Sequence, residues 1–467
     1  MGIINEGFML NNKTAVQLYN DYAKNMPIID YHCHINPQEI AEDRRFGNIT
    51  EVWLEADHYK WRLIRSNAVP ENEITGNADP RVKFQRFAEM LEKAIGNPMY
   101  HWTHMELHKY FGFDGILNAD TAEEVWQLCN SRLKDSNMSA KGLINASNVA
   151  VIGTTDDPCD DLKWHKIIAE DKSFKTKVVP SYRPDKALNI DKPGFCEYIK
   201  NLESVCKSRI ETVADIKTAL AARLEFFCEN GCKAADHGLD RAVYAVESEE
   251  KLNEILKRAL GGEIITGPLA DAYKTDILLF LAGEYSKRDV VMQIHYSVIR
   301  NANTKMYEKL GADTGFDCMS TRPCGDELIR FLDALESRGN LPKTVIYSLN
   351  PNDNAMIDTY LGAFQSTQAA GKIQHGSAWW FNDTKRGMEE QLKSLADLSL
   401  LGNFIGMLTD SRSLLSYTRH DYFRRILCSL IGEWVESGEY PDDRKALKNI
   451  IEGICYKNAL GYFGFNK

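Results

Sequence analysis

The sequence predicts an α/β protein whose strands close into a (β/α)₈ barrel of the TIM type. Short apolar runs recur along the chain, and longer segments with helical periodicity separate them. Most runs are apolar at several consecutive positions, which is typical of strands that are buried on both faces of a parallel sheet. The eight candidate strands are residues 27–35, 149–155, 177–182, 231–237, 289–296, 343–349, 372–379 and 403–410.

A doubly wound open sheet is the main alternative, since it also alternates strands with helices. Such a sheet would carry a glycine-rich phosphate-binding turn after its first strand. Here the corresponding turn reads His34-Ile35-Asn36-Pro37 and has no glycine. The closed barrel is therefore the better prediction.

One connection is much longer than a βα unit requires, because residues 36–148 separate the first candidate strand from the second. Within it Val52, Ala56, Tyr59 and Leu63 recur at spacings of three and four residues, which indicates an amphipathic helix. We therefore expect a single decorated barrel over residues 1–467, with a mostly helical insertion over residues 36–148.

The composition excludes several classes of function. The 467 residues are 44% hydrophobic and 26% charged, and the net charge of −10 disfavours a nucleic-acid partner. Neither an N-terminal signal segment nor a window as long as a membrane span is recognisable. The 11 cysteines are scattered without a CxxC pair, which argues against a zinc ribbon or a disulfide scaffold. We expect a cytoplasmic enzyme with reduced thiols.

The clearest functional signal is Asp30-Tyr31-His32-Cys33-His34, at the end of the first candidate strand. Alternation along a strand places His32 and His34 on one face and Cys33 on the other. Two imidazoles at the C-terminal end of a barrel strand can share one metal ion in the catalytic mouth. Two hydrogen-bonded histidines beside a turn are the alternative, but the position of the pair favours a metal.

The eighth candidate strand ends in a carboxylate, Asp410, and Arg412 follows two residues later. In a closed barrel the last strand lies beside the first, so Asp410 would stand next to His32 and His34. It would then complete a His₂Asp metal site or act as a base beside the metal. Capping of the following helix is the alternative role for Asp410.

An HxH pair on the first strand with an aspartate on the last resembles the amidohydrolase superfamily. More narrowly, the chain resembles the uronate isomerase family, and the joint order of the matching segments is far more specific than any one of them. These segments are DYHCH, DHYKWR (57–62), HWTHMEL (101–107), SYRPD (181–185), ADHGL (235–239), QIHYSVIRN (293–301), the Trp379-Trp380 pair and TDSR (409–412).

The resemblance implies that three arginines contact the carboxylate and hydroxyl groups of a uronate. Arg183, Arg300 and Arg412 follow the third, fifth and eighth candidate strands, so the barrel would place them on its catalytic face. Guanidinium forks match a carboxylate well. Any one of them could instead form a surface salt bridge, but three such arginines in an acidic protein suggest an anionic ligand.

Three other residues receive roles by the same resemblance. Tyr59 and His295 are candidates for proton transfer, and Trp379 would offer an indole donor and an apolar wall. Packing is the alternative for Tyr59 and Trp379, and His295 could instead bind metal. The expected catalytic residues are Asp410, Tyr59 and His295, and the expected ligands of one divalent metal, most naturally zinc, are His32, His34 and Asp410.

The implied reaction is an aldose–ketose isomerisation in hexuronate catabolism, between D-glucuronate and D-fructuronate and between D-galacturonate and D-tagaturonate. A metal-dependent hydrolase of the same superfamily is the first alternative. The fourth candidate strand ends without a lysine and the sixth without a histidine, which disfavours it. A uronate-binding protein without catalysis is the second. We expect a small-molecule hexuronate as partner, neither nucleic acid nor membrane, and leave a homo-oligomer open.

Overall fold

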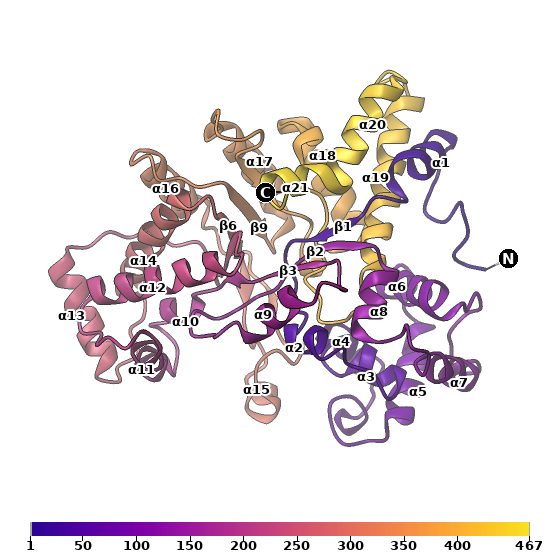
Figure 1. Ribbon diagram of the computed structural model, residues 1–467, viewed down its shortest axis with the longest axis horizontal. Coiled ribbons are helices and arrows are strands. Elements are labelled where there is room, and N and C mark those ends of the chain that lie inside the picture. Colours follow the sequence, from indigo (N-terminus) through magenta and orange to yellow (C-terminus); the bar gives the residue numbers. More distant parts are fainter. Residues whose placement is uncertain (1, 467) are drawn as a thin grey trace.

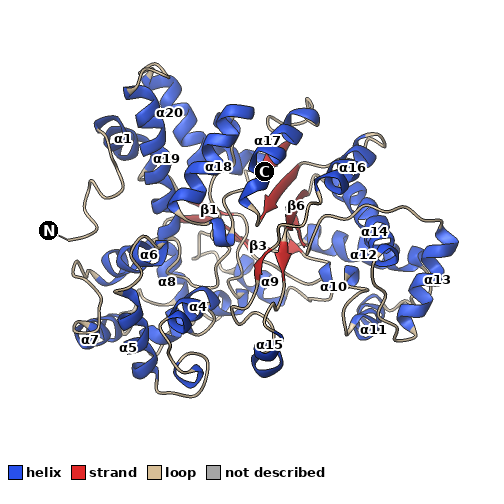
Figure 2. Ribbon diagram, turned by 180° about the vertical axis from the view of Figure 1, so that it is seen from behind, coloured by secondary structure: helices blue, strands red, loops and turns tan. Residues whose placement is uncertain are grey.

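Parallel strands run through the centre of the computed structural model, which describes residues 2–466, and helices surround them (Figure 2). Seven of the eight candidate segments form strands, so the prediction of an α/β fold is confirmed. The parallel strands are β1 (Ile28–Asp30), β2 (Val149–Gly153), β3 (Lys177–Val179), β4 (Ser181–Tyr182), β5 (Ala234–Gly238), β6 (Val291–Tyr296), β9 (Thr344–Ser348) and β10 (Ile373–His375).

These strands form two parallel sheets, one in the order β1-β2-β3 and one in the order β10-β9-β6-β5-β4. The third candidate strand is divided between them, because Pro180 interrupts it and proline has no backbone N–H to donate to a ladder. An isolated parallel bridge from Asp156 to Tyr182 links the two sheets across this break. From β1 to β10, each parallel strand therefore lies beside the parallel strand that comes next in the sequence, and the bridge continues this order from the first sheet to the second.

The prediction of a strand over residues 403–410 is wrong. A 3-10 turn, η6 (Leu401–Asn403), is followed by irregular backbone, and Gly406 and Asp410 have φ values of +78° and +47°, outside the range of a strand. The segment still runs beside β1, since Tyr31 donates its hydroxyl hydrogen to the Gly406 carbonyl over 2.8 Å. The Asp410 N–H likewise donates to the His32 carbonyl over 3.2 Å.

The long connection between β1 and β2 is helical. Most of its helices begin at a side-chain cap, as at Asn36, Asn48 and Asp57, and several have proline in the first turn, which explains where they start. Figure 1 shows α3 to α8 gathered on one side of the strands. The elements are α2 (Pro37–Ala41), α3 (Ile49–Leu54), α4 (His58–Ser66), η2 (Glu71–Glu73), α5 (Pro80–Leu91), α6 (Pro98–Glu106), η3 (Leu107–Phe111), α7 (Ala122–Arg132) and α8 (Ala140–Ala146).

The other helices cover the remaining sides of the strands, with α10 to α14 on the side opposite the long connection (Figure 1). No helix among residues 2–466 is long and apolar enough to span a membrane. The remaining elements are α1 (Lys13–Leu18), η1 (Tyr19–Ala23), α9 (Lys163–Glu170), α10 (Asp185–Leu188), α11 (Phe195–Cys206), α12 (Val213–Glu229), α13 (Glu249–Leu260), α14 (Pro268–Lys287), β7 (Val298–Ile299), α15 (Thr304–Leu310), β8 (Cys318–Met319), α16 (Gly325–Glu336), η4 (Pro351–Asp353), α17 (Asn354–Ala363), η5 (Trp380–Asn382), α18 (Lys385–Leu398), α19 (Thr418–Glu436), α20 (Arg444–Glu452), η7 (Gly453–Lys457) and α21 (Asn458–Tyr462).

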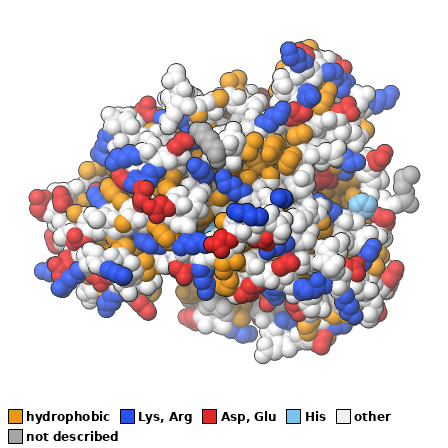
Figure 3. All heavy atoms as spheres, viewed as in Figure 1, with side chains coloured by type: hydrophobic (Ala, Val, Ile, Leu, Met, Phe, Trp, Pro, Cys, Tyr) orange, Lys and Arg blue, Asp and Glu red, His pale blue; other side chains and the backbone are white. Residues whose placement is uncertain are grey.

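Two groups of buried apolar side chains form the core. The larger lies mostly between the helices and the sheets. The smaller takes side chains from six of the parallel strands and from β7, and adds the irregular segment before Asp410 and the aromatic C-terminal end. Its members from the strands are Ile29, Val151, Val179, Ala234, Val291, Val298, Val345 and Tyr347. On the face shown in Figure 3, basic, acidic and apolar side chains are interspersed.

Candidate active site

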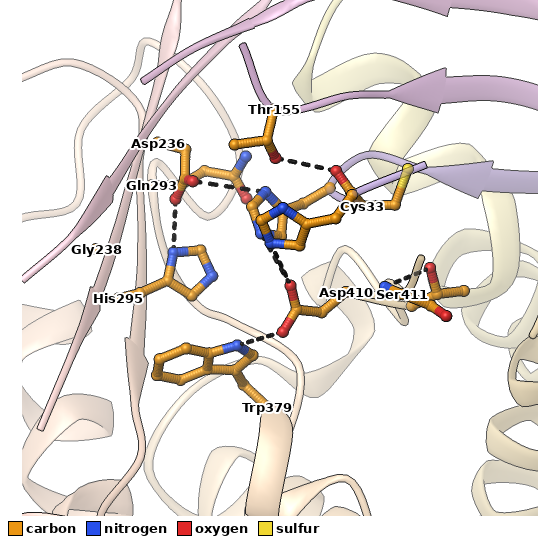
Figure 4. A network of polar contacts seen from close by, with 12 residues as sticks. Cys33, Thr155, Asp236, Gly238, Gln293, His295, Trp379, Asp410 and Ser411 are labelled. Carbon is orange, nitrogen blue, oxygen red and sulfur yellow. Dashed lines mark hydrogen bonds and ion pairs between the residues drawn. The ribbon is translucent and has the colours of Figure 1, made fainter. Parts of the chain in front are cut away.

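A cavity of about 630 Å³ lies where the strands end, and all nine residues that the sequence singled out line it. They come from the end of β6, from the loops after the strands and from helix α4 of the long connection. These residues are His32, His34, Tyr59, Arg183, His295, Arg300, Trp379, Asp410 and Arg412. Figure 4 shows several of them around Asp410.

Asp410 stands between the two histidines of the HxH motif. Its Oδ1 lies 3.3 Å from His32 Nε2 and 3.1 Å from His34 Nε2. Strand β1 ends at Asp30, so the alternation used to predict a common direction does not extend to these histidines; the loop after the strand sets it. One ligand atom from each of the three residues lies within 4.8 Å of the others, which fits a shared metal ion.

The pKa shifts of Asp410 and His34 suit a cation, whereas burial lowers the pKa of His32 but Asp236 and Asp410 outweigh burial and raise it. Burial raises the pKa of Asp410, but His32 and His34 outweigh this effect and hold the pKa well below its usual range. Burial lowers the pKa of His34 to about 4, so this imidazole is neutral and can act as a ligand at neutral pH. The donor set therefore matches the His and carboxylate ligands that zinc prefers.

The second carboxylate oxygen of Asp410 faces the opposite side of the cavity. Trp379 donates its indole N–H to this Oδ2 over 2.9 Å, and the Tyr59 hydroxyl lies 3.5 Å from it. Asp57 caps helix α4 at Tyr59 and Lys60, which fixes the helix start beside the cavity. Burial raises the pKa of Tyr59 well above its usual value, so its hydroxyl keeps its proton at neutral pH.

Asp236 is a central residue to which sequence reasoning assigned no function. It is fully buried on β5, and its carboxylate lies 3.0 Å from Arg183 Nη1, 2.7 Å from His295 Nδ1 and 3.9 Å from His32 Nδ1. A carboxylate at the end of a buried parallel strand is the signal that could have identified it. His32, Asp236 and His295 also lie close enough for a metal, but the guanidinium of Arg183 makes a cation there unfavourable.

His295 is held in one orientation. Its ring stacks on Tyr347 with a centroid distance of 4.2 Å, and Asp236 engages its Nδ1. The other ring nitrogen, Nε2, is buried without a hydrogen-bond partner among residues 2–466. It is therefore free to bond a molecule in the cavity.

The three arginines differ in how their charges are balanced. Arg183 pairs with Asp185 and Asp236, and Arg300 pairs with Asp317 over 2.9 Å. Arg412 forms no ion pair with any residue in the described part of the chain. Its uncompensated charge makes it the strongest candidate for binding an anionic group.

The histidines of α6 and η3 each have a separate partner. His101 contacts the Tyr422 hydroxyl, His104 bonds the backbone of Tyr100 and Leu117, and His108 pairs with Asp114. These contacts are those of structural or surface histidines.

The chain matches known proteins over nearly its whole length. The family model of glucuronate isomerase matches residues 1–463. The chain is 56% identical over 463 residues to a uronate isomerase of Lachnospira eligens, with 99% of each chain covered. It is similar to the crystal structure of a uronate isomerase from Thermotoga maritima, with 33% identity, 98% and 99% coverage and a TM-score of 0.93.

A more distant structure shares the fold alone. It is a proposed metal-dependent hydrolase from Lactobacillus casei, with 12% identity, a TM-score of 0.55, and 95% of this chain and 96% of that chain covered. The match of the family model and the identity over nearly the full length are decisive: the chain belongs to the glucuronate isomerase family and is an isomerase.

Proposed function

We propose that the chain interconverts D-glucuronate and D-fructuronate, and D-galacturonate and D-tagaturonate, in hexuronate catabolism. The observation that carries the proposal is the arrangement around Asp410, whose two oxygens face a histidine pair on one side and the Trp379 and Tyr59 donors on the other. Arg412 stands in the same cavity with an uncompensated positive charge. This combination suits a sugar acid with an aldehyde at one end and a carboxylate at the other.

His32, His34 and Asp410 would hold one divalent metal ion, and zinc fits this donor set. When bound, such an ion would supply positive charge that stabilises negative charge developing on substrate oxygens. Because burial lowers the pKa of His34, this imidazole is neutral at neutral pH and can bind a cation. In this proposal the metal site is of the type found in the amidohydrolase superfamily.

The isomerisation of the open-chain aldehyde must remove a proton from C2 and another from the C2 hydroxyl, and deliver one to C1 and one to O1. Asp410 is ionised at neutral pH and would carry the carbon-bound proton from C2 to C1. Tyr59 would donate to a substrate oxygen, because its hydroxyl keeps its proton. His295 would accept or return the other oxygen-bound proton through its free Nε2.

The arginines and Trp379 would bind and orient the substrate. Arg412 and Arg300 would contact the carboxylate, and Arg183 the hydroxyl groups, because Asp236 and Asp185 already balance its charge. Trp379 would place its indole ring against sugar carbons while its N–H holds Asp410.

We also propose that the two sheets and residues 403–410 together close a (β/α)₈ barrel. Layers of side chains fill the interior of such barrels, and the smaller core group takes side chains from six of the parallel strands and adds Ile405 and Leu408. Residues 1–467 would then form one domain, and residues 36–148 an insertion that carries Tyr59 to the site. A cytoplasmic location is supported by the eleven cysteines, which are all free thiols.

Proton NMR of D-glucuronate with the zinc-supplied protein in D₂O tests the reaction. Fructuronate with deuterium at C1 is the expected product of proton transfer through Asp410. Fructuronate without deuterium would support the isomerase but replace the proton step by a hydride shift or a shielded proton. A folded protein that forms no ketose from either uronate would contradict the proposal, and release of product from amides or lactones would then favour a hydrolase.

A further inference from the structure

All the polar groups of Thr409 bond to side chains that are both charged and buried. Asp30 accepts the Thr409 N–H over 2.8 Å and its hydroxyl hydrogen over 2.6 Å. Arg419 donates from Nη1 to the Thr409 carbonyl over 3.1 Å. Asp30 is 0% and Arg419 2% exposed, and charges so deeply buried are unfavourable unless they are well bonded.

The residue that follows has an unusual backbone. Asp410 adopts φ +47°, in the left-handed region that residues with a Cβ visit rarely and only where their surroundings require it. Its N–H donates to the His32 carbonyl, so its backbone is anchored on both sides. This conformation turns Oδ1 toward His32 and His34 and Oδ2 toward Trp379 (Figure 4).

Arg419 has independent anchors that make it a rigid donor. It lies in the first turn of α19, its guanidinium carbon is 4.1 Å from the centre of the Trp102 ring, and Asp383 lies 3.5 Å from its Nη1. Trp102 belongs to α6 of the long connection. Arg419, itself on α19, therefore contacts three other segments: α6, the residue after η5 and the backbone before Asp410.

We propose that Arg419 is a positioning residue for catalysis, which acts with Asp30 through Thr409 to hold the Asp410 carboxylate between the histidine pair and Trp379. Arg419 itself does not line the cavity. The inference rests on the proposed role of Asp410. A carboxylate that must transfer a proton has to be held within a fraction of an ångström, so release of its backbone lowers the rate of the chemical step.

The first experiment compares Arg419→Met, Arg419→Lys and Arg424→Met. Arg424 is the matched control: it lies on the same helix, is buried, and donates to the backbone carbonyls of Met26 and Pro27, away from the cavity. We expect Arg419→Met to lower kcat for D-glucuronate ~10- to 100-fold with little change in KM. Arg419→Lys keeps a donor and recovers most of this loss. Arg424→Met lowers the Tm as much as Arg419→Met but leaves kcat unchanged.

A second measurement does not depend on turnover. The metal-stripped proteins are titrated with Zn²⁺ against a chromophoric chelator, and we expect Arg419→Met to bind zinc ~10-fold more weakly, as supporting residues of metal ligands commonly do when removed. Thr409→Val, which removes the hydroxyl bond to Asp30 and the weaker bond that the hydroxyl accepts from the Ser411 N–H, should weaken zinc binding in the same direction. It also keeps the test valid if Arg419→Met fails to fold.

Two results would separate this inference from the proposed function. Asp410→Asn that retains both kcat and zinc affinity would refute the role of Asp410, and the positioning role with it. The positioning role alone would be overturned by a different pair of results. In that case Asp410→Asn loses both kcat and zinc affinity, whereas Arg419→Met and Thr409→Val have the same kcat and zinc affinity as the control Arg424→Met.

Discussion

His295 Nδ1 lies 2.7 Å from Asp236 Oδ1, and both side chains are buried. A carboxylate at Nδ1 favours the tautomer with the hydrogen on that nitrogen, which leaves Nε2 as a hydrogen-bond acceptor facing the cavity. The stacking of His295 on Tyr347 prevents the ring from turning over. Asp236 therefore determines the proton state in which His295 meets a substrate.

Replacement of Asp236 by asparagine should lower kcat for D-glucuronate by ~10- to 100-fold, because His295 loses the carboxylate that sets its tautomer and Arg183 loses one of its two carboxylate partners. Steady-state kinetics measure the loss. The matched control is Asp358→Asn, since the fully buried Asp358 lies 2.7 Å from Nδ1 of His375 and neither residue lines the cavity. If both substitutions affect kcat equally, general destabilisation explains the result and Asp236 has no specific role.

Tyr59→Phe should reduce kcat ~10²-fold with the fold intact, because only the hydroxyl is removed and its nearest polar neighbour is Asp410. The ring, which packs against His58 and Trp380, is preserved. Tyr110→Phe removes another buried hydroxyl in the long connection, bonded to Ser147, and should leave kcat unchanged. Circular dichroism and Tm of both variants check the fold, and normal turnover by Tyr59→Phe would exclude its hydroxyl from the reaction.

The convergence of His32 and Asp410 could be predicted from the sequence, although the prediction of a strand over residues 403–410 is wrong. Neighbouring parallel strands all end on the same side of their sheet, so residues that follow them gather there whether or not each segment forms a regular ladder. The cavity depends on this topology more than on the extent of any strand. The early end of β1 at Asp30 therefore does not separate His32 from Asp410.

The backbone of Asp410 and the role of Asp236 could not be predicted in the same way. The left-handed φ of Asp410 depends on bonds from Asp30 and Arg419 to its neighbour Thr409, and Asp30 is 379 residues away in the sequence. The sequence places Asp236 in a candidate strand, over residues 231–237, without revealing which charges meet it there. Such long-range contacts between polar side chains leave no periodic pattern in the chain.

Arg412→Met should raise KM for D-glucuronate ~10- to 100-fold, as expected when a charged hydrogen bond to a carboxylate is lost. Its positive charge has no ion-pair partner within residues 2–466, so no internal contact is broken by the change. Arg322→Met, an exposed arginine of the neighbouring cavity, is the control and should leave KM unaltered. An unchanged KM in Arg412→Met would assign carboxylate recognition to Arg300 or Arg183 instead.

Asp156 and His165 should give opposite contributions to the pH dependence of stability. Burial raises the pKa of Asp156 to about 7 and lowers the pKa of His165 to about 4, and the two side chains lie 3.7 Å apart. The folded state holds the Asp156 proton more tightly than the unfolded state, so the stability from Asp156 is complete at acidic pH and is lost as the pH rises toward 7. For His165 the unfolded state binds the proton more tightly, so stability rises with pH between about 4 and 6.5.

Asp156→Asn should expose the His165 contribution alone. The free energy of unfolding of the variant, relative to the unchanged protein, is expected to grow by on the order of 1 kcal/mol per pH unit between pH about 4 and about 7. Urea denaturation at several pH values measures this difference, and other titrating groups cancel in it. Asp397→Asn, on the exposed side of α18, should show a flat difference. A flat difference for Asp156→Asn as well would mean that Asp156 is ionised in the folded protein throughout this range, with its charge stabilised by Thr154 and the Ser181 N–H.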